Sequence, residues 1–189
     1  LALYENASAL RGLEQYQNVI ANNIAASHVA GFKKVAVSFE AVDGGEIARS
    51  THDRLRNEMP GSFPVMKNQV DFSEGELRQS NNPMDMAIRG EGFFGLINSN
   101  GDVVYTRDGQ FYMNADGIMV NSMGHEFAGN GGNNIQTVPG GGDPTIDKEG
   151  QVFQNGQLLG QVGVFVFDDP LMQLRKVGGG FVAKNPEVE

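Results

Sequence analysis

The residues best suited to chemistry in this sequence are a run of glycines, three histidines and many carboxylates. The run GEGFFG, residues 90–95, matches the G-x-G-x-x-G pattern of dinucleotide-binding sites. In such a site the glycines open a helix whose N-terminus holds the pyrophosphate. Here strand-forming residues continue through Ile97. We therefore expect these glycines to mark a bulge or a close approach of backbone segments, and we expect no cofactor.

The other reactive residues form no recognisable catalytic or metal-binding pattern. The chain has no cysteine, and His28, His52 and His125 are not spaced as paired metal ligands. Residues 98–102 begin like a calcium loop but lack its glycine and closing glutamate, so we expect a turn. There is neither a nucleophile elbow nor a P-loop. We predict no catalytic residues, no metal site and no enzyme activity, although the sequence leaves open a pair of carboxylates across a cleft.

The composition argues against two classes of partner. The 189 residues include 23 acidic and 14 basic side chains, which gives a formal net charge of −9. Nucleic acids and anionic membranes attract basic surfaces, so neither is expected as a partner. No apolar run is long enough to insert across a membrane, and the N-terminus lacks the pattern of a cleavable secretory signal.

Residues 1–27 are predicted to form one amphipathic helix, because apolar residues recur every three, four or seven positions. These residues are Leu3, Ala7, Leu10, Leu13, Ile20 and Ile24. Such a helix is marginal in water and depends on packing its apolar side against something. The partner could be its own domain or another chain. We favour another chain, since the following sequence offers no obvious surface for the helix.

The rest of the chain divides into a weakly patterned segment and a strand-rich body. Val35, Val37 and Phe39 alternate briefly, and prolines and mixed charges follow them, which favours an extended arm or linker over 35–68. From residue 69 onward, short apolar runs alternate with Asn-Gly and Asp-Gly turn signals. We therefore expect a mainly β fold. It consists of a helical assembly segment over 1–34, the arm over 35–68, and an antiparallel sandwich or barrel-like body over 69–189.

Periodicity adds three expectations about strands in the body. Two strands are expected within residues 70–80, and another through Met84, Met86 and Ile88. In residues 162–167 three valines alternate with glycine and phenylalanine, so both faces of a strand there would be apolar. This pattern predicts a central strand that is buried on both faces.

Three blocks of the sequence resemble the flagellar rod and hook proteins of bacteria. Residues 8–34 resemble the family's A-N-N-[IL]-A-N helix end with the T-x-G-[FY]-[KR] that follows it. Residues 75–94 resemble its G-x-L-x-x-T-x-x-P-L-D-[VL]-A-I-x-G-x-G-[FW]-F segment, and residues 105–124 resemble its block that begins Y-T-R-[DN]-G. The matching residues of the first block are Ala21, Asn22, Asn23, Ile24, Ala25, Gly31, Phe32 and Lys33. Residues 146–182 look most like a rod protein of the short class, with a proximal position ahead of a distal one.

The resemblance implies a structural subunit of the basal-body rod that assembles helically and transmits torque. Its implied partners are other rod and hook proteins, further copies of itself in a helical tube, and the flagellar export apparatus, which passes the chain without a cleaved signal peptide. In the family, a second long helix follows the β body and packs on the first; this sequence ends at Glu189 before one. The implied assembly residues are Leu3, Leu10, Leu13, Ile20, Asn22, Asn23, Ile24, Gly31, Phe32 and Lys33.

The paired asparagines Asn22 and Asn23 are expected to supply amide hydrogen bonds to neighbouring helices or to the arm. Two other functions stay open beside the rod subunit. A β-sandwich that binds carbohydrate or peptidoglycan would need exposed aromatic residues, yet the chain has no Trp and only four Tyr. An enzyme would need a cluster of titratable groups with shifted pKa values, which a sequence does not reveal.

Overall fold

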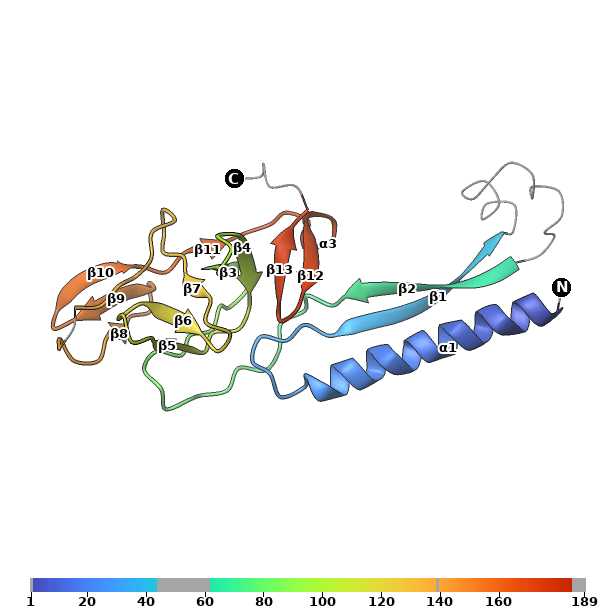
Figure 1. Ribbon diagram of the computed structural model, residues 1–189, viewed down its shortest axis with the longest axis horizontal. Coiled ribbons are helices and arrows are strands. Elements are labelled where there is room, and N and C mark those ends of the chain that lie inside the picture. The colour runs from blue at the N-terminus through green and yellow to red at the C-terminus, as the bar shows by residue number, and fades with distance from the viewer. Residues whose placement is uncertain (1, 44–61, 139, 185–189) are drawn as a thin grey trace. The chain divides into compact units, whose positions relative to one another are not determined.

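The computed structural model describes residues 2–43, 62–138 and 140–184 (Figure 1). The chain forms two compact units. The first, here called the helical unit, consists of Leu1–His28 and Lys33–Phe72. The second, here called the β body, consists of Val29–Phe32 and Ser73–Glu189. The chain thus leaves the helical unit after His28, contributes four residues to the β body and returns at Lys33.

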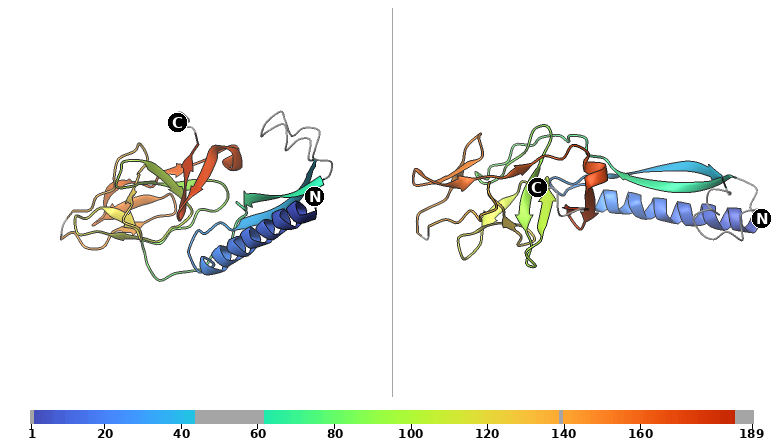
Figure 2. Two further views of the ribbon diagram at one scale, coloured as in Figure 1. Left: turned by 45° about the vertical axis from the view of Figure 1, so that its right-hand side comes forward. Right: turned by 90° about the horizontal axis from the view of Figure 1, so that it is seen from above.

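The helical unit is a long helix beside a two-stranded antiparallel sheet. Helix α1 spans Ala2–Ala25, and strands β1 (Val35–Asp43) and β2 (Ser62–Val70) pair from Val35↔Val70 to Asp43↔Ser62. We call β1 and β2 the ribbon; α1 runs along it (Figure 2). Lys34 closes the base of the ribbon, because its carbonyl accepts a hydrogen bond from the amide of Asp71 and its Nζ lies 3.1 Å from the carboxylate of Asp71.

The ribbon differs from the irregular segment that the sequence suggested after the helix. The brief alternation from Val35 to Phe39 does form a strand, but its partner β2 lies in a stretch where Pro64 and polar residues indicated a loop. Pro64 is tolerated near the start of β2, because the ribbon has only two strands and each has a free edge. The expected arm also covers residues 44–61, which lie outside the described residues. The three-part division by role stays a prediction.

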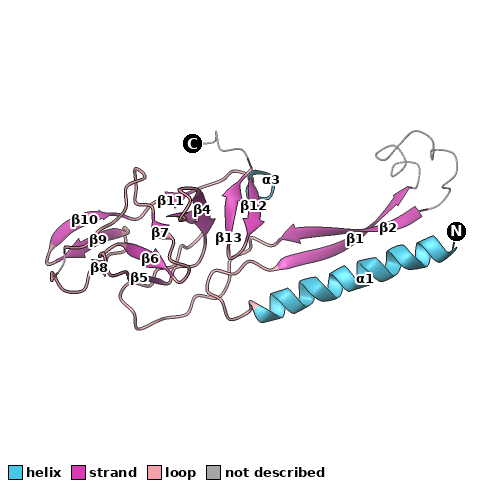
Figure 3. Ribbon diagram, viewed as in Figure 1, coloured by secondary structure: helices cyan, strands magenta, loops and turns pink. Residues whose placement is uncertain are grey.

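The β body is built from antiparallel strands, as the sequence predicted (Figure 3). Its larger sheet has the order β12-β13-β4-β3-β7-β6-β5, with β11 paired to β3, and a smaller sheet has the order β10-β9-β8. Both sheets are open, and the described strands close no barrel. The strands of the larger sheet are β3 (Phe93–Ile97), β4 (Val103–Thr106), β5 (Phe111–Met113), β6 (Met119–Asn121), β7 (Glu126–Phe127), β11 (Val164–Phe165), β12 (Leu174–Val177) and β13 (Gly180–Ala183). Those of the smaller sheet are β8 (Thr145–Ile146), β9 (Gln151–Gln154) and β10 (Gln157–Gln161), and a short helix, α3 (Pro170–Gln173), precedes β12.

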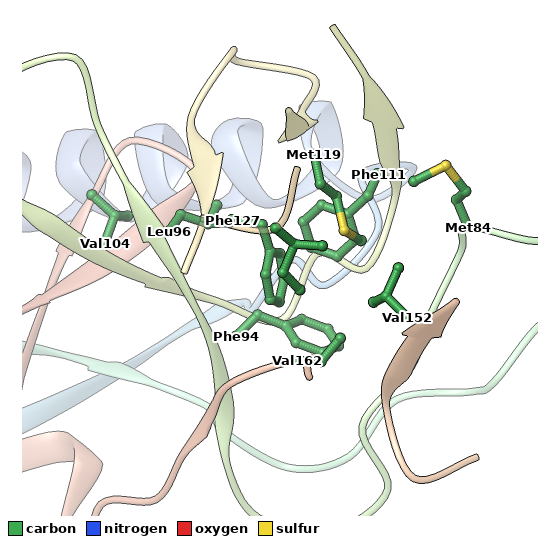
Figure 4. Close-up of a cluster of buried hydrophobic side chains, with 10 residues drawn as sticks. Met84, Phe94, Leu96, Val104, Phe111, Met119, Phe127, Val152 and Val162 are labelled. Carbon is green, nitrogen blue, oxygen red and sulfur yellow. The ribbon is translucent and has the colours of Figure 1, made fainter. Parts of the chain in front are cut away.

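The core of the β body is centred on three phenylalanines (Figure 4). The rings of Phe94 and Phe111 pack edge to face with centroids 5.6 Å apart, and those of Phe111 and Phe127 at 4.8 Å. Met119 and Val152, both fully buried, bring the two sheets into the same core. Burying such side chains contributes roughly 1.5–3 kcal/mol each, so this cluster accounts for much of the stability of the body.

Four loops of the β body share one hydrogen-bonding pattern. In each, an Asn or Asp side chain accepts from the backbone N–H two and four residues later, and a glycine three residues later has a positive φ of 74–86°. The loops begin at Asn98, Asn114, Asn121 and Asp147. The first of them is the segment with a calcium-loop-like start, and the expectation of a turn there is confirmed.

Some of the strand predictions in the body are wrong. Residues 71–90 contain no strand in the structure, although two were expected within residues 70–80, and the strand expected through Met84, Met86 and Ile88 begins only at Phe93, as β3. This segment is irregular, and the Met84 side chain enters the core from a turn in which the Asp85 N–H donates to the carbonyl of Asn82. Residues 162–167 form no doubly buried central strand, because Val164 is 48% and Val166 62% exposed. Only Val164 and Phe165 pair with β3. Val162 is buried in the core, whereas the side chains of Val164 and Val166 are exposed.

Candidate assembly interface

The apolar side of α1 is exposed over its described length. Leu10 is 66% exposed, Leu13 55%, Ile20 38% and Ile24 66%. We call these four residues the stripe; Leu3 continues it along the helix in sequence, but its side chain lies outside the described part of the structure. Helix formation orders these residues, yet none of the four is buried by the chain's own residues as described. A soluble protein gains little by aligning four large aliphatic side chains in water, so the stripe is a candidate interface.

A different side of α1 meets the ribbon. The rings of Tyr16 and Phe39 lie with centroids 6.2 Å apart, and a side chain at Gly12 would meet the ring of Phe39. Val19 is half-buried. Together with Asn23, the helix residues Gly12, Tyr16 and Val19 recur at intervals of four and three, so they form a second face beside the stripe. This spacing could have been found in the sequence. It does not stand out as an apolar face, because two of its four positions are a glycine and an asparagine.

Asn23 fixes the helix end to the start of β1. Its Nδ2 donates to the carbonyl of Val35 at 2.9 Å, and its Oδ1 accepts from the Val35 N–H at 3.0 Å. The expectation of amide hydrogen bonds to the arm is confirmed for this residue. Asn22 points elsewhere: its side chain is exposed, while its backbone carbonyl accepts from Ala26 at the helix end.

Gly31 lies against the backbone of the β body. Its φ is +67°, and a Cβ built there would fall 2.1 Å from the Arg107 carbonyl carbon and 2.1 Å from the Asp108 nitrogen. Only glycine satisfies both requirements, since other residues strain at this φ and the approach leaves no room for a side chain. The motif expected to serve assembly therefore also has a role in the fold of the single chain.

Phe32 and Lys33 also make contacts within the units they belong to. The Lys176 ammonium lies 4.2 Å from the centroid of the Phe32 ring, and burial lowers the pKa of Lys176. Lys33, 9% exposed, donates from Nζ to the carbonyl of Phe72 at 3.4 Å. A role for Gly31, Phe32 and Lys33 in assembly stays a prediction.

Arg107 was not among the residues that the sequence indicated as functional. Its backbone lies beside Gly31, and its side chain binds the segment around Gly90. Its Nη2 donates to the carbonyl of Gly90 at 2.7 Å, and its guanidinium carbon lies 5.0 Å from the centroid of the Phe93 ring. Burial lowers the pKa of Arg107, and nearby Glu74 and Glu91 act against that shift. The run GEGFFG thus contributes a carbonyl acceptor and close packing: a side chain at Gly92 would lie 2.6 Å from Val164, so the predicted close approach is confirmed.

Asp108, the other backbone neighbour of Gly31, carries an unfavourable charge. Burial raises the pKa of Asp108, and the nearby Asp85 carboxylate raises it further, while the N–H of Gln110 donates to its Oδ1 and lowers it. The backbone of Asp108 lies against Gly31, so this residue has a structural role in the fold.

The described residues contain no group of three or more potential metal ligands. Among the same residues, no helix is both long enough and apolar enough to cross a membrane.

Comparison with known proteins gives consistent matches. Residues 87–154 match the family described as the flagellar hook protein FlgE/F/G D1 domain. The chain is 34% identical over 188 residues to the flagellar basal-body rod protein FlgF of Mesorhizobium japonicum, covering 98% of this chain and 73% of the relative. It is 32% identical over 173 residues to FlgF of Caulobacter vibrioides, covering 89% of this chain and 66% of the relative. The flagellar hook protein FlgE of Escherichia coli is 31% identical over 129 residues, 68% of this chain and 29% of that protein.

Proposed function

Because this chain belongs to the family of flagellar basal-body rod and hook proteins, we propose that it is a structural subunit of the rod, joined to neighbouring axial subunits through the stripe on α1. Similarity to two FlgF proteins favours the proximal part of the rod. In that position the subunit transmits torque and has no catalytic task. The chain reaches the site through the flagellar export apparatus and assembles in the basal body.

The exposure of Leu10, Leu13, Ile20 and Ile24 on one ordered helix supports this proposal most directly. Transfer of a large aliphatic side chain out of water is worth about 1.5–3 kcal/mol when complete. Four such side chains supply a substantial driving force for association, even after ordering costs are subtracted.

The contacts within the chain favour a narrower interface than the sequence implied. The stripe faces away from the contacts of the described chain, and Leu3 continues it in sequence, so these residues form the proposed surface. The side chain of Asn22 is exposed too, but its position two residues from both Ile20 and Ile24 puts it on the opposite side of α1, where it could contact a different neighbour. Asn23, Gly31, Phe32 and Lys33 have partners within the chain and shape the subunit that presents the surface. A head-to-tail contact between the stripe of one subunit and a different surface of the next does not close on itself, and it generates a helical tube.

The experiment replaces two stripe residues by serine, Leu10→Ser with Leu13→Ser, in the full-length gene. The matched control is Gln15→Ser with Asn18→Ser, two exposed positions on the same stretch of α1 but off the stripe. We expect the stripe variant to fold and be exported normally, to be absent from purified basal bodies and to abolish swimming. The control should assemble and swim. Normal rods and motility from the stripe variant would contradict the proposal.

A further inference from the structure

The backbone of the ribbon points outward at alternate residues, and the hydrogen bonds at its base show which ones. The N–H and the carbonyl of Val35 both bond to the side chain of Asn23, so they point away from β2. The carbonyl of Lys34, one residue earlier, accepts from the N–H of Asp71, which follows β2, so it points toward the partner strand. Backbone groups alternate between the two sides along an antiparallel strand. The outer edge of β1 is therefore formed by the odd-numbered residues from 35 to 43.

The outer edge of β2 is interrupted, whereas that of β1 is not. In the register of the ribbon, Pro64 lies opposite Ala41 and so occupies an outward position of β2, where its nitrogen offers no N–H. Proline at such a position is one of the devices by which proteins stop an edge strand from pairing with another chain. Residues 35–42 of β1 contain no proline, glycine or basic residue. Their one charged residue, Glu40, forms an ion pair with Lys67 inside the ribbon.

The other sheet edges that the structure describes are short or protected. Strand β12 carries Arg175 and Lys176, and β10 has an irregular register between Leu158 and Gly160. Strands β5, β8 and β11 contain only two or three residues each. Charged residues, bulges and short length all discourage pairing with another chain. At nine residues, β1 is the one long edge of the described chain that lacks these features.

We propose that two copies of this protein pair through the outer edges of β1, antiparallel and centred on Phe39. The free outward positions define this centre, because Asn23 already occupies the groups of Val35, and the next three outward residues are Val37, Phe39 and Ala41. No described residue bonds to the outward groups of Val37 or Phe39. With Phe39 opposite its own copy, Val37 lies opposite the second copy's Ala41, and each such pair exchanges two N–H···O bonds.

The side chains at this centre favour the same pairing. Phe39 is 52% exposed although its ring contacts Tyr16, and in the pair the two Phe39 rings stand side by side on one face of the joined sheets. Helix α1 lies over a face of the ribbon and leaves this edge open (Figure 2), because the Phe39 side chain that meets it stands perpendicular to the plane of the backbone hydrogen bonds.

A pair of this kind differs from the head-to-tail contact proposed for the stripe. Its two-fold symmetry closes the contact after two copies, so it does not propagate along a tube. The two contacts use different elements, so the pairing through β1 does not rest on the proposed function of the stripe. It describes subunits outside the rod, whose two ribbons join into one four-stranded sheet.

Disulfide formation between two single-cysteine variants tests the register, because the sequence has no cysteine of its own. In the proposed pair, Ser38 of one copy lies opposite Glu40 of the other with Cα atoms about 4.5 Å apart, within reach of a disulfide. The full-length variants Ser38→Cys and Glu40→Cys are mildly oxidised, alone and mixed, and we expect a covalent dimer mainly from the mixture. A mixture of Lys67→Cys and Gln69→Cys, on one face of β2, is the control and should form none. Equal crosslinking by either variant alone, or by the control, would overturn the pairing.

Sedimentation equilibrium of the full-length protein measures the pairing without a crosslink. Val37→Pro removes an outward N–H from β1 and leaves the bonds to β2 in place, as Pro64 does on the other strand. Each dimer then loses two hydrogen bonds, so we expect its dissociation constant to rise about tenfold or more. Asn68→Pro is the control, because Asn68 lies directly opposite Val37 but faces the interrupted edge, and it should leave the dissociation constant unchanged.

Two results would overturn the proposal. One is a full-length protein that stays monomeric at every concentration, and the other is equal weakening by the two prolines. Slow hydrogen exchange at the Val37 N–H in such a monomer would identify the occupant of the edge as another segment of the same chain.

Discussion

The side-chain amide of Asn23 pairs with the backbone of Val35 through two hydrogen bonds, one in each direction. An asparagine amide carries the same donor and acceptor as a peptide group, so Asn23 satisfies both polar groups of Val35 as a neighbouring strand would. The helix end and the first residue of β1 are thereby joined across twelve positions of sequence. The side chain of the adjacent Asn22 is exposed and makes no such pairing with the described residues.

Replacing Asn23 by alanine should loosen the ribbon from the helix. Each hydrogen bond contributes about 0.5–1.5 kcal/mol, and the Val35 groups would be left partly buried without their partner. We expect Asn23→Ala to lower the unfolding free energy of the helical unit by roughly 1–3 kcal/mol. Amide hydrogen exchange at Val35 should accelerate accordingly.

The matched control for this prediction is Asn22→Ala. Because the side chain of Asn22 is exposed, its replacement should leave exchange at Val35 unchanged and alter stability by less than about 0.5 kcal/mol. Equal effects of the two substitutions would show that general helix propensity, and not the amide pairing with Val35, controls this part of the chain.

Replacing Gly31 by alanine should lower the free energy of unfolding by more than an unfavourable φ alone would. The added methyl carbon would fall within 2.1 Å of the backbone of Arg107 and Asp108, so residues 29–32 would have to move away. Gly90 is the control, because it also has a positive φ, +81°, but no atom lies within 4 Å of a Cβ built there. Gly90→Ala should lower the free energy of unfolding by about 1–2 kcal/mol, the usual cost of a left-handed conformation for a residue with a side chain. Gly31→Ala should lower it distinctly more. Urea unfolding of both variants measures this; equal losses would mean that the close approach is easily relieved.

The turns show what local sequence predicts well. The Asn-Gly and Asp-Gly pairs that end at Gly101, Gly117 and Gly156 correctly indicated turns with a positive φ, which is a local property. The repeated pattern was visible in sequence as an Asn or Asp three residues before a glycine, at Asn98, Asn114, Asn121 and Asp147. The pair Asp108–Gly109 resembles these turns, yet Gly109 has no positive φ; a side chain there would collide with the carbonyl of Met86. An Asp-Gly pair can therefore form a turn with a positive φ or allow close contact with another segment, and the tertiary contacts determine which of the two occurs.

Long-range pairing is what the sequence did not reveal. Strand β2 has little alternation of its own and depends on β1 for its partner. Residues 84–88 have a strand-like pattern, but Met84 enters the core from a turn, and the segment then bonds to the carbonyl of Gly109 through the N–H of Met86. For the candidate interface, periodicity identified the stripe and the resemblance identified Asn23. Only the structure separated the exposed stripe from the face that meets the ribbon.

The raised pKa of Asp108 predicts a pH-dependent effect of Asp108→Asn. Because the folded chain binds this proton more tightly than the unfolded chain, Asp108 contributes less to stability as the pH rises from its ordinary pKa near 3.8 through its raised folded pKa. Asparagine keeps the acceptor for the Gln110 N–H without the charge. We expect the variant to match the original protein at about pH 3 and to have the higher Tm at neutral pH. Calorimetric scans across this range test the prediction, and a constant difference in Tm at every pH would contradict it.

Gln154 offers the clearest test of a buried polar contact in the smaller sheet. The side chain is 6% exposed; its Oε1 accepts from the Val138 N–H at 2.8 Å, and its Nε2 donates to the carbonyls of Val138 at 3.2 Å and Gly142 at 2.7 Å. These three bonds tie residues 138 and 142 to β9. In Gln154→Leu the shape is nearly preserved, but the three backbone groups lose their partner. Each unsatisfied buried group costs about 1–3 kcal/mol. Because water can reach some of these backbone groups, we expect the free energy of unfolding to fall by roughly 2–4 kcal/mol.

The control is Gln157→Leu, the same substitution at an exposed position on the neighbouring strand β10, which should change stability by less than about 0.5 kcal/mol. Thermal unfolding gives the loss, and hydrogen exchange at Val138 locates it, because the N–H that Gln154 holds should exchange faster only in Gln154→Leu. If Gln154→Leu is as stable as the original protein, hydrophobic packing at this site compensates for the lost hydrogen bonds, and the amide does not hold the loop.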